Sequence, residues 1–393
     1  MLRLGVIGYG SRISGVVRLC QRTEPATRIV AITDINLEAA KKRLEERKDF
    51  NLEKVQDVHW YTDAEEMLRK EDLDGVFVGT RCSLHTTMAV KVAPTGIPLY
   101  LEKPVSTTME DLKKLKAAFD KSTSEVVVSF PLRLTPLAQV AREVVEAGRI
   151  GAISHVQAVN NVPYGTGYFS SWYRDYNETG GLWLQKATHD FDCINYLVGQ
   201  PPVLVAAMES QRVMGHGMPD ITCDQCDKQE ECPQSPYADF YLHGAVDHFE
   251  PKAKACAFHS DPRYHDNGSA LVEYANGVHA CYTQNFLTRR DAATRGATLI
   301  GYKGTIQFDW YTNLVKITSH HASRTDTVNC TSQHGHGGGD LELIVNFVNV
   351  MKGKAKSRSP ISAGIMSALM CLKARTAAQT HTFQKIDLAE LDS

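Results

Sequence analysis

The segment Leu4-Gly5-Val6-Ile7-Gly8-Tyr9-Gly10 decides the fold of the first part of this chain. A short apolar run comes directly before two glycines. A dinucleotide-binding unit begins in this way, with a strand, a tight glycine turn and a helix whose N-terminus receives the pyrophosphate. A second segment, Leu101-Glu102-Lys103-Pro104, follows a later apolar run. Lys103 is therefore expected at the carboxyl end of a parallel strand, where open α/β sheets bind ligands.

Strand-like and helix-like segments alternate through roughly the first 125 residues, which predicts a doubly wound parallel sheet. We assign this Rossmann domain to residues 1–128. Thr108 or Ser106 is expected to cap its last helix. The expected strands are 3–7, 28–33, 60–61, 75–79, 98–101 and 125–129, and the expected helices are 14–21, 37–47, 64–70, 85–92 and 107–120.

The remaining residues, 129–393, predict a second α/β domain with a large, mostly antiparallel open sheet. Tyr274-Ala275-Asn276-Gly277-Val278 is typical of a hairpin. A polar, cysteine-containing insert is expected at about 213–266. The expected strands are 154–160, 203–208, 270–274, 278–284, 297–301, 304–309 and 314–318, and the expected helices are 137–146, 182–197, 340–351 and 362–379.

Composition excludes several classes of protein. The chain has 393 residues, enough for two or three domains, and a formal net charge of −2. That charge gives no basic field for a nucleic acid or a membrane surface. No apolar run approaches the roughly 18 residues of a membrane span. The N-terminus enters a strand directly and lacks a signal peptide, so we expect a cytoplasmic protein.

The glycine turn predicts a nicotinamide cofactor. Gly8 and Gly10 match the first two glycines of the fingerprint, while Ile13 stands in place of the third. Asp34 follows the second strand and favours NAD over NADP, because a carboxylate repels a 2′-phosphate. Arg12 opposes this inference, since a guanidinium can meet a phosphate bidentately. The alternative is a simple helix-capping turn with a solvated aspartate.

The order of these features resembles the Gfo/Idh/MocA family of NAD(P)-dependent sugar and polyol oxidoreductases. The resemblance covers nearly the whole chain. It rests on the glycine turn and on Glu102-Lys103-Pro104, and on looser motifs: Gly79-Thr80 with His85, Gly148-Arg149-Ile150-Gly151, Gly180-Gly181, His189-Asp190-Phe191-Asp192 and His336-Gly337-Gly338-Gly339-Asp340. Such proteins pair a Rossmann domain with an α/β domain whose open sheet often mediates oligomers, so the resemblance implies a dimer or tetramer.

The resemblance also implies residue roles. Lys103 would contact the substrate and the nicotinamide ribose, His189 would be the general acid and base, and Glu102 would help to hold the lysine. Two positions depart from the family pattern: Arg81 replaces a proline, and Gln185-Lys186 stands where many members have an acidic residue. The expected cofactor-binding residues are Gly8, Gly10, Ser11, Arg12, Ile13, Asp34, Thr80, Arg81, His85, Glu102 and Lys103.

The chemistry suits these residue types. Oxidation of a secondary alcohol removes a hydride and a proton; histidine titrates near neutral pH, and a lysine cation stabilises the developing alkoxide. If residues 182–197 form a helix, Lys186, His189 and Asp192 share one face. Asp192 would then orient the imidazole and complete a catalytic set; alternatively, it caps or pairs elsewhere. His189 itself could instead be a hydrogen-bonded core residue.

Aromatic residues between Pro163 and Tyr176 suit the apolar face of a sugar ring. The alternative is a loop that these aromatics pin to the surface. Tyr164, Trp172 and Tyr173 are the expected substrate contacts there, together with Lys103, Lys186 and His189.

Cys223, Cys226 and Cys232 form a C-x2-C-x5-C pattern that could clip a structural zinc ion, with Cys256, His259 or His265 as the fourth ligand. The alternatives are free thiols or a disulfide. The other cysteines of the ten in the chain are scattered and are expected to be mostly reduced.

Three functions remain open from the sequence. The first is an NAD-dependent dehydrogenase acting on a sugar, polyol or glycoside. The second is a glycoside hydrolase or lyase that uses NAD for transient oxidation, elimination and re-reduction. The third is a non-catalytic NAD-binding sensor, which would need neither Lys103 nor His189.

Overall fold

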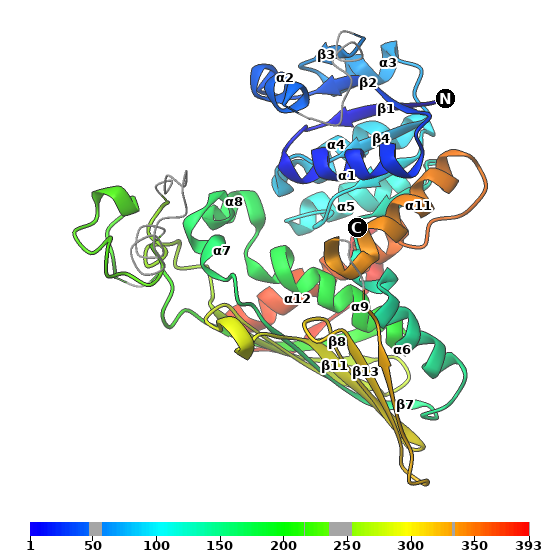
Figure 1. The fold of residues 1–393 in the computed structure, drawn as a ribbon, viewed down its shortest axis with the longest axis vertical. Coiled ribbons are helices and arrows are strands. Elements are labelled where there is room, and N and C mark those ends of the chain that lie inside the picture. Colours follow the sequence, from blue (N-terminus) through cyan, green and yellow to red (C-terminus); the bar gives the residue numbers. More distant parts are fainter. Residues whose placement is uncertain (47–56, 216, 236–253, 332–334, 393) are drawn as a thin grey trace.

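A computed structural model describes residues 1–46, 57–215, 217–235, 254–331 and 335–392. The chain forms two sheets, one of six strands and one of nine, with helices between them (Figure 1). This is the α/β architecture expected from the sequence. No helix in the described ranges is long and apolar enough to cross a membrane.

The N-terminal sheet is entirely parallel, in the order β3-β2-β1-β4-β5-β6. Its central strands are buried on both faces, as continuous Val/Ile/Leu runs predict. The order reverses between β1 and β4, so the crevice for a ligand lies at their carboxyl ends. The strands are β1 (Leu2–Ile7), β2 (Thr27–Thr33), β3 (His59–Tyr61), β4 (Gly75–Val78), β5 (Leu99–Leu101) and β6 (Val126–Val128).

The connecting helices begin where the sequence places capping residues. The predicted Thr108 cap is confirmed: its hydroxyl accepts a hydrogen bond from the Asp111 amide at 3.1 Å. Asn36 and Asp63 cap two further helices in the same way. The helices are α1 (Ser11–Thr23), α2 (Leu37–Glu45), α3 (Ala64–Lys70), α4 (His85–Val92) and α5 (Met109–Phe119).

The second sheet has the order β14-β13-β12-β11-β7-β10-β9-β8-β15. It is antiparallel except where β10 runs parallel to β7. The predicted hairpin is confirmed, because β9 and β10 pair across a turn in which Gly277 has φ +82°. The strands are β7 (Ile153–Asn161), β8 (Pro202–Ser210), β9 (Asn267–Tyr274), β10 (His279–Asn285), β11 (Thr294–Gly301), β12 (Gly304–Asp309), β13 (Leu314–Ser319), β14 (Thr325–Asn329) and β15 (Gln384–Lys385).

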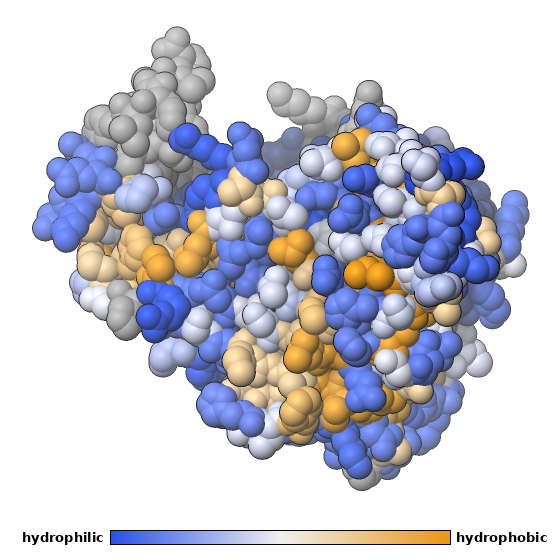
Figure 2. Space-filling view, turned by 90° about the horizontal axis from the view of Figure 1, so that it is seen from below, coloured by the Kyte–Doolittle hydropathy of each residue, from blue (hydrophilic) through white to orange (hydrophobic). Residues whose placement is uncertain are grey.

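Among the described residues, helices cover one face of the nine-stranded sheet, the face toward the N-terminal unit (Figure 1). They are α6 (Pro136–Glu146), α9 (Thr188–Val198) and α12 (Ile361–Thr380). The other face is open. Seen from below in Figure 2, the surface mixes hydrophobic and pale residues with hydrophilic ones. The exposed Met208 and Leu271 belong to β8 and β9.

A helix from late in the chain completes the core of the N-terminal unit. α11 (Gly339–Met351) packs against α1, and the ring of Phe347 lies 5.0 Å from that of Phe77 and 5.7 Å from that of Tyr100. All three side chains are fully buried. The domain boundary at residue 128 stays a prediction. However, α11 comes from the residues assigned to the second domain and packs in the core of the N-terminal unit.

The carboxylate of Asp266 connects the two ends of the predicted insert. Asp266 is fully buried and accepts hydrogen bonds from the amides of Arg212, Val213 and Met214. Both ends of the predicted insert are therefore tied together. Residues 164–180 pack against it through two short helices, α7 (Thr166–Ser170) and α8 (Tyr176–Thr179).

The α11 packing predicts that Phe347→Ala lowers the free energy of unfolding by about 3–5 kcal/mol, since it opens a cavity in a closed aromatic cluster. Val345→Ala on the same helix is the control, because Val345 is 36% exposed and its truncation costs little. Urea unfolding measures both. Equal losses for the two variants would contradict the packing role of Phe347.

Candidate active site

The turn after β1 leaves room for a pyrophosphate. Gly8 has φ +81°, and a Cβ there would lie 2.8–2.9 Å from atoms of Thr80. Gly10 occupies the N-cap position of α1, whose first turn holds no acidic residue. The first-turn amides of α1 therefore have no acidic side chain in that turn competing for them, and such donors fit a dinucleotide phosphate.

Ile13 replaces the third glycine of the fingerprint, and the structure shows how the fold accommodates it. The third glycine normally allows close packing of helix and strand. Here the close approach is made by Gly79, directly after β4, where a Cβ would lie 2.7 Å from the Cβ of Ile13. The glycine that permits this close packing therefore lies at the end of β4 and not in α1.

Asp34 lies directly after β2, and its carboxylate accepts hydrogen bonds from the amides of Tyr9 (2.8 Å) and Asn36 (2.9 Å). Arg12 is not free to meet a phosphate. Its guanidinium pairs with Glu102 at 3.0 Å and with Asp340 at 2.6 Å. The argument that Arg12 favours NADP is therefore wrong, and Arg12 instead joins α1 to β5 and α11.

A cavity of about 270 Å³ lies between the carboxyl ends of β4 and β5 and the start of α9. It brings together most of the residues singled out from the sequence. Its lining comprises Arg12, Gly79, Thr80, Cys82, His85, Glu102, Lys103, Ser129, Tyr164, Tyr168, Trp172, Tyr173, Gln185, Lys186, His189, Arg295 and His336.

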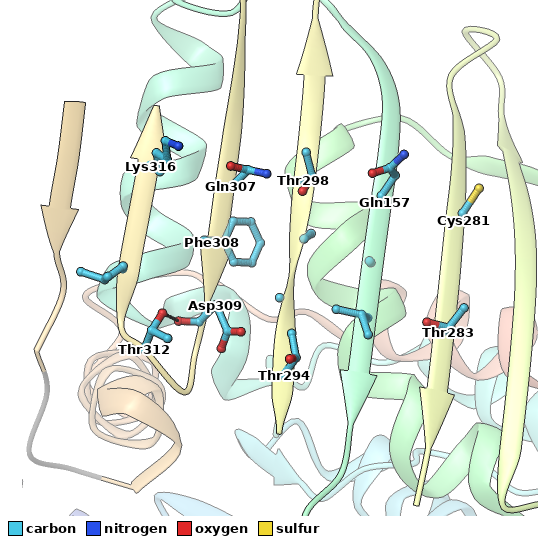
Figure 3. Close-up of a pocket in the computed structure, with 15 residues that line it drawn as sticks. Gln157, Cys281, Thr283, Thr294, Thr298, Gln307, Phe308, Asp309, Thr312 and Lys316 are labelled. Atoms are coloured by element: carbon cyan, nitrogen blue, oxygen red, sulfur yellow. Dashed lines mark hydrogen bonds between the residues drawn. The ribbon is translucent and has the colours of Figure 1, made fainter. Parts of the chain in front are cut away.

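A larger hollow of about 630 Å³ lies elsewhere, on the open face of the nine-stranded sheet. Figure 3 shows Gln157, Thr298, Gln307 and Lys316 projecting from neighbouring strands there. Its lining is mainly hydroxyl, amide and small side chains, without a histidine. The chemistry-bearing groups gather in the smaller cavity, so we place the active site there.

Lys103 reaches from one unit to the other. Its ammonium donates to the carbonyl oxygen of Gln185 at 2.7 Å. Gln185 lies in a π-helical turn, Trp183–Ala187, that leads directly into α9. Such wide turns occur frequently at functional sites. The sequence predicted one continuous helix here; the wider turn offers a main-chain carbonyl to the lysine.

His189 lies in the first turn of α9 and is 6% exposed. Its Nδ1 has no partner in the described structure. Burial lowers the pKa of the imidazole well below its ordinary value, and the nearby cations Lys103 and Arg295 lower it further. His189 is therefore neutral at neutral pH and can accept a proton.

The expectation that Asp192 orients this imidazole is wrong. Asp192 forms a buried ion pair with Arg133, whose Nε lies 2.9 Å from the carboxylate. Lys186 and His189 do line the cavity together, as predicted, but Asp192 lies one turn further along α9 and outside that lining. Its role is structural, because a buried carboxylate requires a charge partner.

The aromatic segment is divided between a packed core and the lining of the cavity, and its contact with a sugar stays a prediction. Phe169 is fully buried in a small core with residues of the insert. Tyr164 and Trp172 line the cavity, and Trp172 stacks on Tyr173 with ring centroids 4.1 Å apart. The guanidinium of Arg81 lies 3.9 Å from the Trp172 ring centroid. Arg81 thus fastens the N-terminal unit to this aromatic wall.

Two family models together match most of the chain. The NAD-binding Rossmann fold of the oxidoreductase family GFO_IDH_MocA matches residues 2–130, and the GFO/IDH/MocA C-terminal domain matches residues 138–307. The chain belongs to the Gfo/Idh/MocA family. It is an NAD-binding oxidoreductase of the sugar and polyol dehydrogenase type.

Individual related proteins support this family assignment. YteT of Bacillus subtilis (strain 168), whose name describes an oxidoreductase, is 27% identical over 71% of this chain and 73% of its own length. The scyllo-inositol 2-dehydrogenase (NAD(+)) of the same organism is 26% identical over 55% of this chain and 56% of its own. The WlbA dehydrogenase of Bordetella pertussis, solved with NADH and UDP-GlcNAcA, shares the fold: TM-score 0.71, 18% identity, and 98% and 99% of the two chains covered.

Several cavity residues of this Gfo/Idh/MocA protein were not predicted as site residues. Arg295 comes from the middle of the second sheet, and a single arginine in an alternating strand gives no signal. His336 and Asp340 lie in a motif already noted, and His336 contacts Asp340 at 2.8 Å. Asp190, next to His189, forms an ion pair with Arg295 at 2.8 Å.

The structure gives the zinc prediction no support. Among the described residues, no group of three or more histidine, cysteine, aspartate or glutamate side chains is arranged to hold a metal ion. Cys223, Cys226 and Cys232 are all described, as are the proposed fourth ligands, and all ten cysteines are free thiols.

The Ile13–Gly79 contact generates a prediction. Gly79→Ala brings a new Cβ against Ile13 and is expected to lower the free energy of unfolding by about 1–3 kcal/mol. Adding Ile13→Gly removes the opposing Cβ, so the double variant should lose less stability than the sum of the two single variants. Gly15→Ala is the control, since no atom lies within 4 Å of the position that its Cβ would take. Thermal unfolding measures all of them; additive losses in the double variant would contradict the contact.

Proposed function

We propose that this protein is an NAD-dependent dehydrogenase that oxidises a secondary alcohol of a sugar or polyol, with Lys103 and His189 as its catalytic residues. One observation carries the proposal. Lys103 and His189 come from different units yet line one cavity, at the carboxyl ends of the strands that also carry the glycine turn. Hydride transfer needs a cofactor site, a proton acceptor and a cation at one place.

The reaction balances with these groups. Oxidation breaks the C–H bond of the carbinol, and NAD, when bound, would supply the acceptor for the hydride. The O–H bond breaks and its proton goes to the neutral imidazole of His189, leaving a carbonyl. The ammonium of Lys103 stabilises the negative charge that develops on the oxygen. The reverse reaction uses the same groups in the opposite order.

NAD is the proposed cofactor because Asp34 is held by two backbone amides and stays in place after β2. Its carboxylate would accept hydrogen bonds from the ribose hydroxyls and would repel a 2′-phosphate. The names of related proteins support this choice, since the Bacillus subtilis scyllo-inositol 2-dehydrogenase is an NAD(+) enzyme.

Lys103→Met tests the catalytic assignment. We expect NADH binding to persist and turnover to fall by about 1,000-fold, because the cation at the developing alkoxide is lost. Lys114→Met is the matched control, since Lys114 is exposed on α5 and pairs with Glu110. NADH fluorescence measures binding, and absorbance at 340 nm measures turnover. Near-normal turnover in Lys103→Met would remove the lysine from the mechanism.

The same assay separates redox chemistry from redox-neutral hydrolysis. A dehydrogenase forms one NADH for each alcohol oxidised. Aryl glycosides that release their aglycone without net NADH would instead establish the NAD-dependent glycosidase, and the proposed dehydrogenase would be wrong.

The pH dependence follows from the pKa directions. Oxidation needs neutral His189, so activity is present above its pKa and is lost as the pH falls through it. Because burial lowers the pKa of His189 well below its ordinary value, kcat/KM should hold down to pH values below about 6.5. Burial also lowers the pKa of Lys103, so the alkaline loss begins below the ordinary lysine range. An acid limb unchanged by His189→Gln would contradict the base assignment.

We further propose that a second copy of this chain covers the open face of the nine-stranded sheet. The face is broad, carries hydroxyl and small side chains around the hollow in Figure 3, and exposes Leu271 and Met208. Leu271→Lys places a charge on it and should shift the protein toward monomer in light scattering. Unchanged mass in that variant would argue against this face.

A further inference from the structure

The active-site cavity holds cations that its own residues do not neutralise. Lys186 is 4% exposed. Its ammonium donates to the hydroxyl of Tyr164 at 2.6 Å and lies 4.7 Å from that ring's centroid. Lys103 is held by a main-chain carbonyl. No carboxylate in the described part of the chain forms an ion pair with either ammonium.

Arg295 adds a buried donor without an acceptor. The side chain is 9% exposed, and its Nε donates to Asp190 at 2.8 Å. Its Nη2 is buried and has no hydrogen-bond partner among the described residues. Asp190 cannot supply one readily, because its other oxygen already accepts from Asn160 (2.7 Å) and Tyr282 (2.8 Å). An unpaired buried donor is costly unless a ligand satisfies it.

The carboxylates near the cavity are already occupied. Glu102 accepts from Arg12 at 3.0 Å and from the hydroxyl of Ser129 at 3.1 Å. Asp340 is held by Arg12 and His336. Lys103, Lys186 and Arg295 therefore line a small cavity whose neighbouring carboxylates Glu102 and Asp340 are already paired. An anionic group entering this space would be bound by groups that already lie in place.

The electrostatic surroundings of Lys186 also favour the binding of an anion. Burial lowers the pKa of its ammonium well below the ordinary value, and the Arg295 cation lowers it further. A bound anion would reverse this, since an opposite charge favours the charged form.

We infer that the substrate carries a carboxylate: it is a sugar acid whose carboxylate binds Lys186 and Arg295 while its carbinol meets Lys103 and His189. The inference rests on the proposed function and names the substrate class of that site. A carboxylate is favoured over a phosphate because the free donors are one ammonium and one guanidinium edge. Phosphate sites commonly add several backbone amides, and here that helix end is assigned to the cofactor.

The aromatic wall completes the recognition. Tyr164, Tyr168, Trp172 and Tyr173 line the same cavity. Their rings suit the C–H face of a sugar, while the cations hold its carboxylate. A neutral sugar would leave the Lys186 ammonium without an anionic partner and the Nη2 of Arg295 without an acceptor. A site that needs a polar partner rejects analogues that lack it.

The test compares matched sugars on the NAD-loaded protein. D-glucuronate and D-galacturonate are set against D-glucose and D-galactose and against the corresponding 6-phosphates, with NADH formation as the readout. We expect kcat/KM for a uronate to exceed that of its neutral partner by at least about 100-fold. Equal or faster turnover of a neutral sugar or a sugar phosphate would overturn the inference and leave the dehydrogenase proposal intact.

Two variants isolate the cation. Lys186→Met keeps the length of the side chain and removes a buried charge that has no carboxylate partner, so the variant should fold. We expect it to raise KM for the uronate. It should also reduce the ratio of kcat/KM for the uronate to kcat/KM for the neutral sugar by at least about tenfold. Lys186→Gln should behave alike. Lys303→Met, exposed between β11 and β12, is the control. An unchanged preference in both Lys186 variants would overturn the inference.

Calorimetry separates this inference from the proposed function. If no sugar reduces NAD, the same panel is titrated into the NADH-loaded protein. Binding of a uronate that is lost in Lys186→Met, with no binding of the neutral sugars, supports the anion site even though the dehydrogenase proposal fails. Absence of uronate binding contradicts the anion site.

Discussion

The hydrogen bond from the Lys103 ammonium to the Gln185 carbonyl fixes the active site. It joins the end of a strand in one sheet to the turn that starts α9 over the other. Neither unit holds the proposed catalytic groups alone, since Lys103 belongs to the first and His189 to the second. The accepting oxygen lies in the π-helical turn at Trp183–Ala187, which leads directly into α9.

Ion pairs next to Lys103 support its contact with Gln185. Arg12 binds Glu102 and Asp340 together, and so ties α1, the end of β5 and α11 into one assembly. Glu102 is thereby held next to Lys103 without neutralising it directly. The same arrangement leaves Lys186 and part of Arg295 unpaired in the cavity. Buried cations of this kind make sense where an anionic ligand completes the site.

Local patterns predicted most of the fold. Glycine turns, strand periodicity and the Thr108 cap were sufficient for the parallel sheet, and the Asn276-Gly277 turn for a hairpin in the second sheet. The site was predictable where a residue belongs to a motif, as for Lys103 and His189. Arg295 could not be found, because long-range strand pairing brings it to the cavity. Asp192 was misassigned because helical spacing cannot show that Arg133 lies beside it on a distant turn.

The most direct test of the active-site assignment is a crystal structure with NADH bound. We expect the nicotinamide ring to enter the cavity, with its reactive face toward the space between Lys103 and His189, and the pyrophosphate to lie at the first amides of α1. A nicotinamide directed away from that cavity, with Lys103 and His189 out of reach of its ring, would contradict the assignment of the active site.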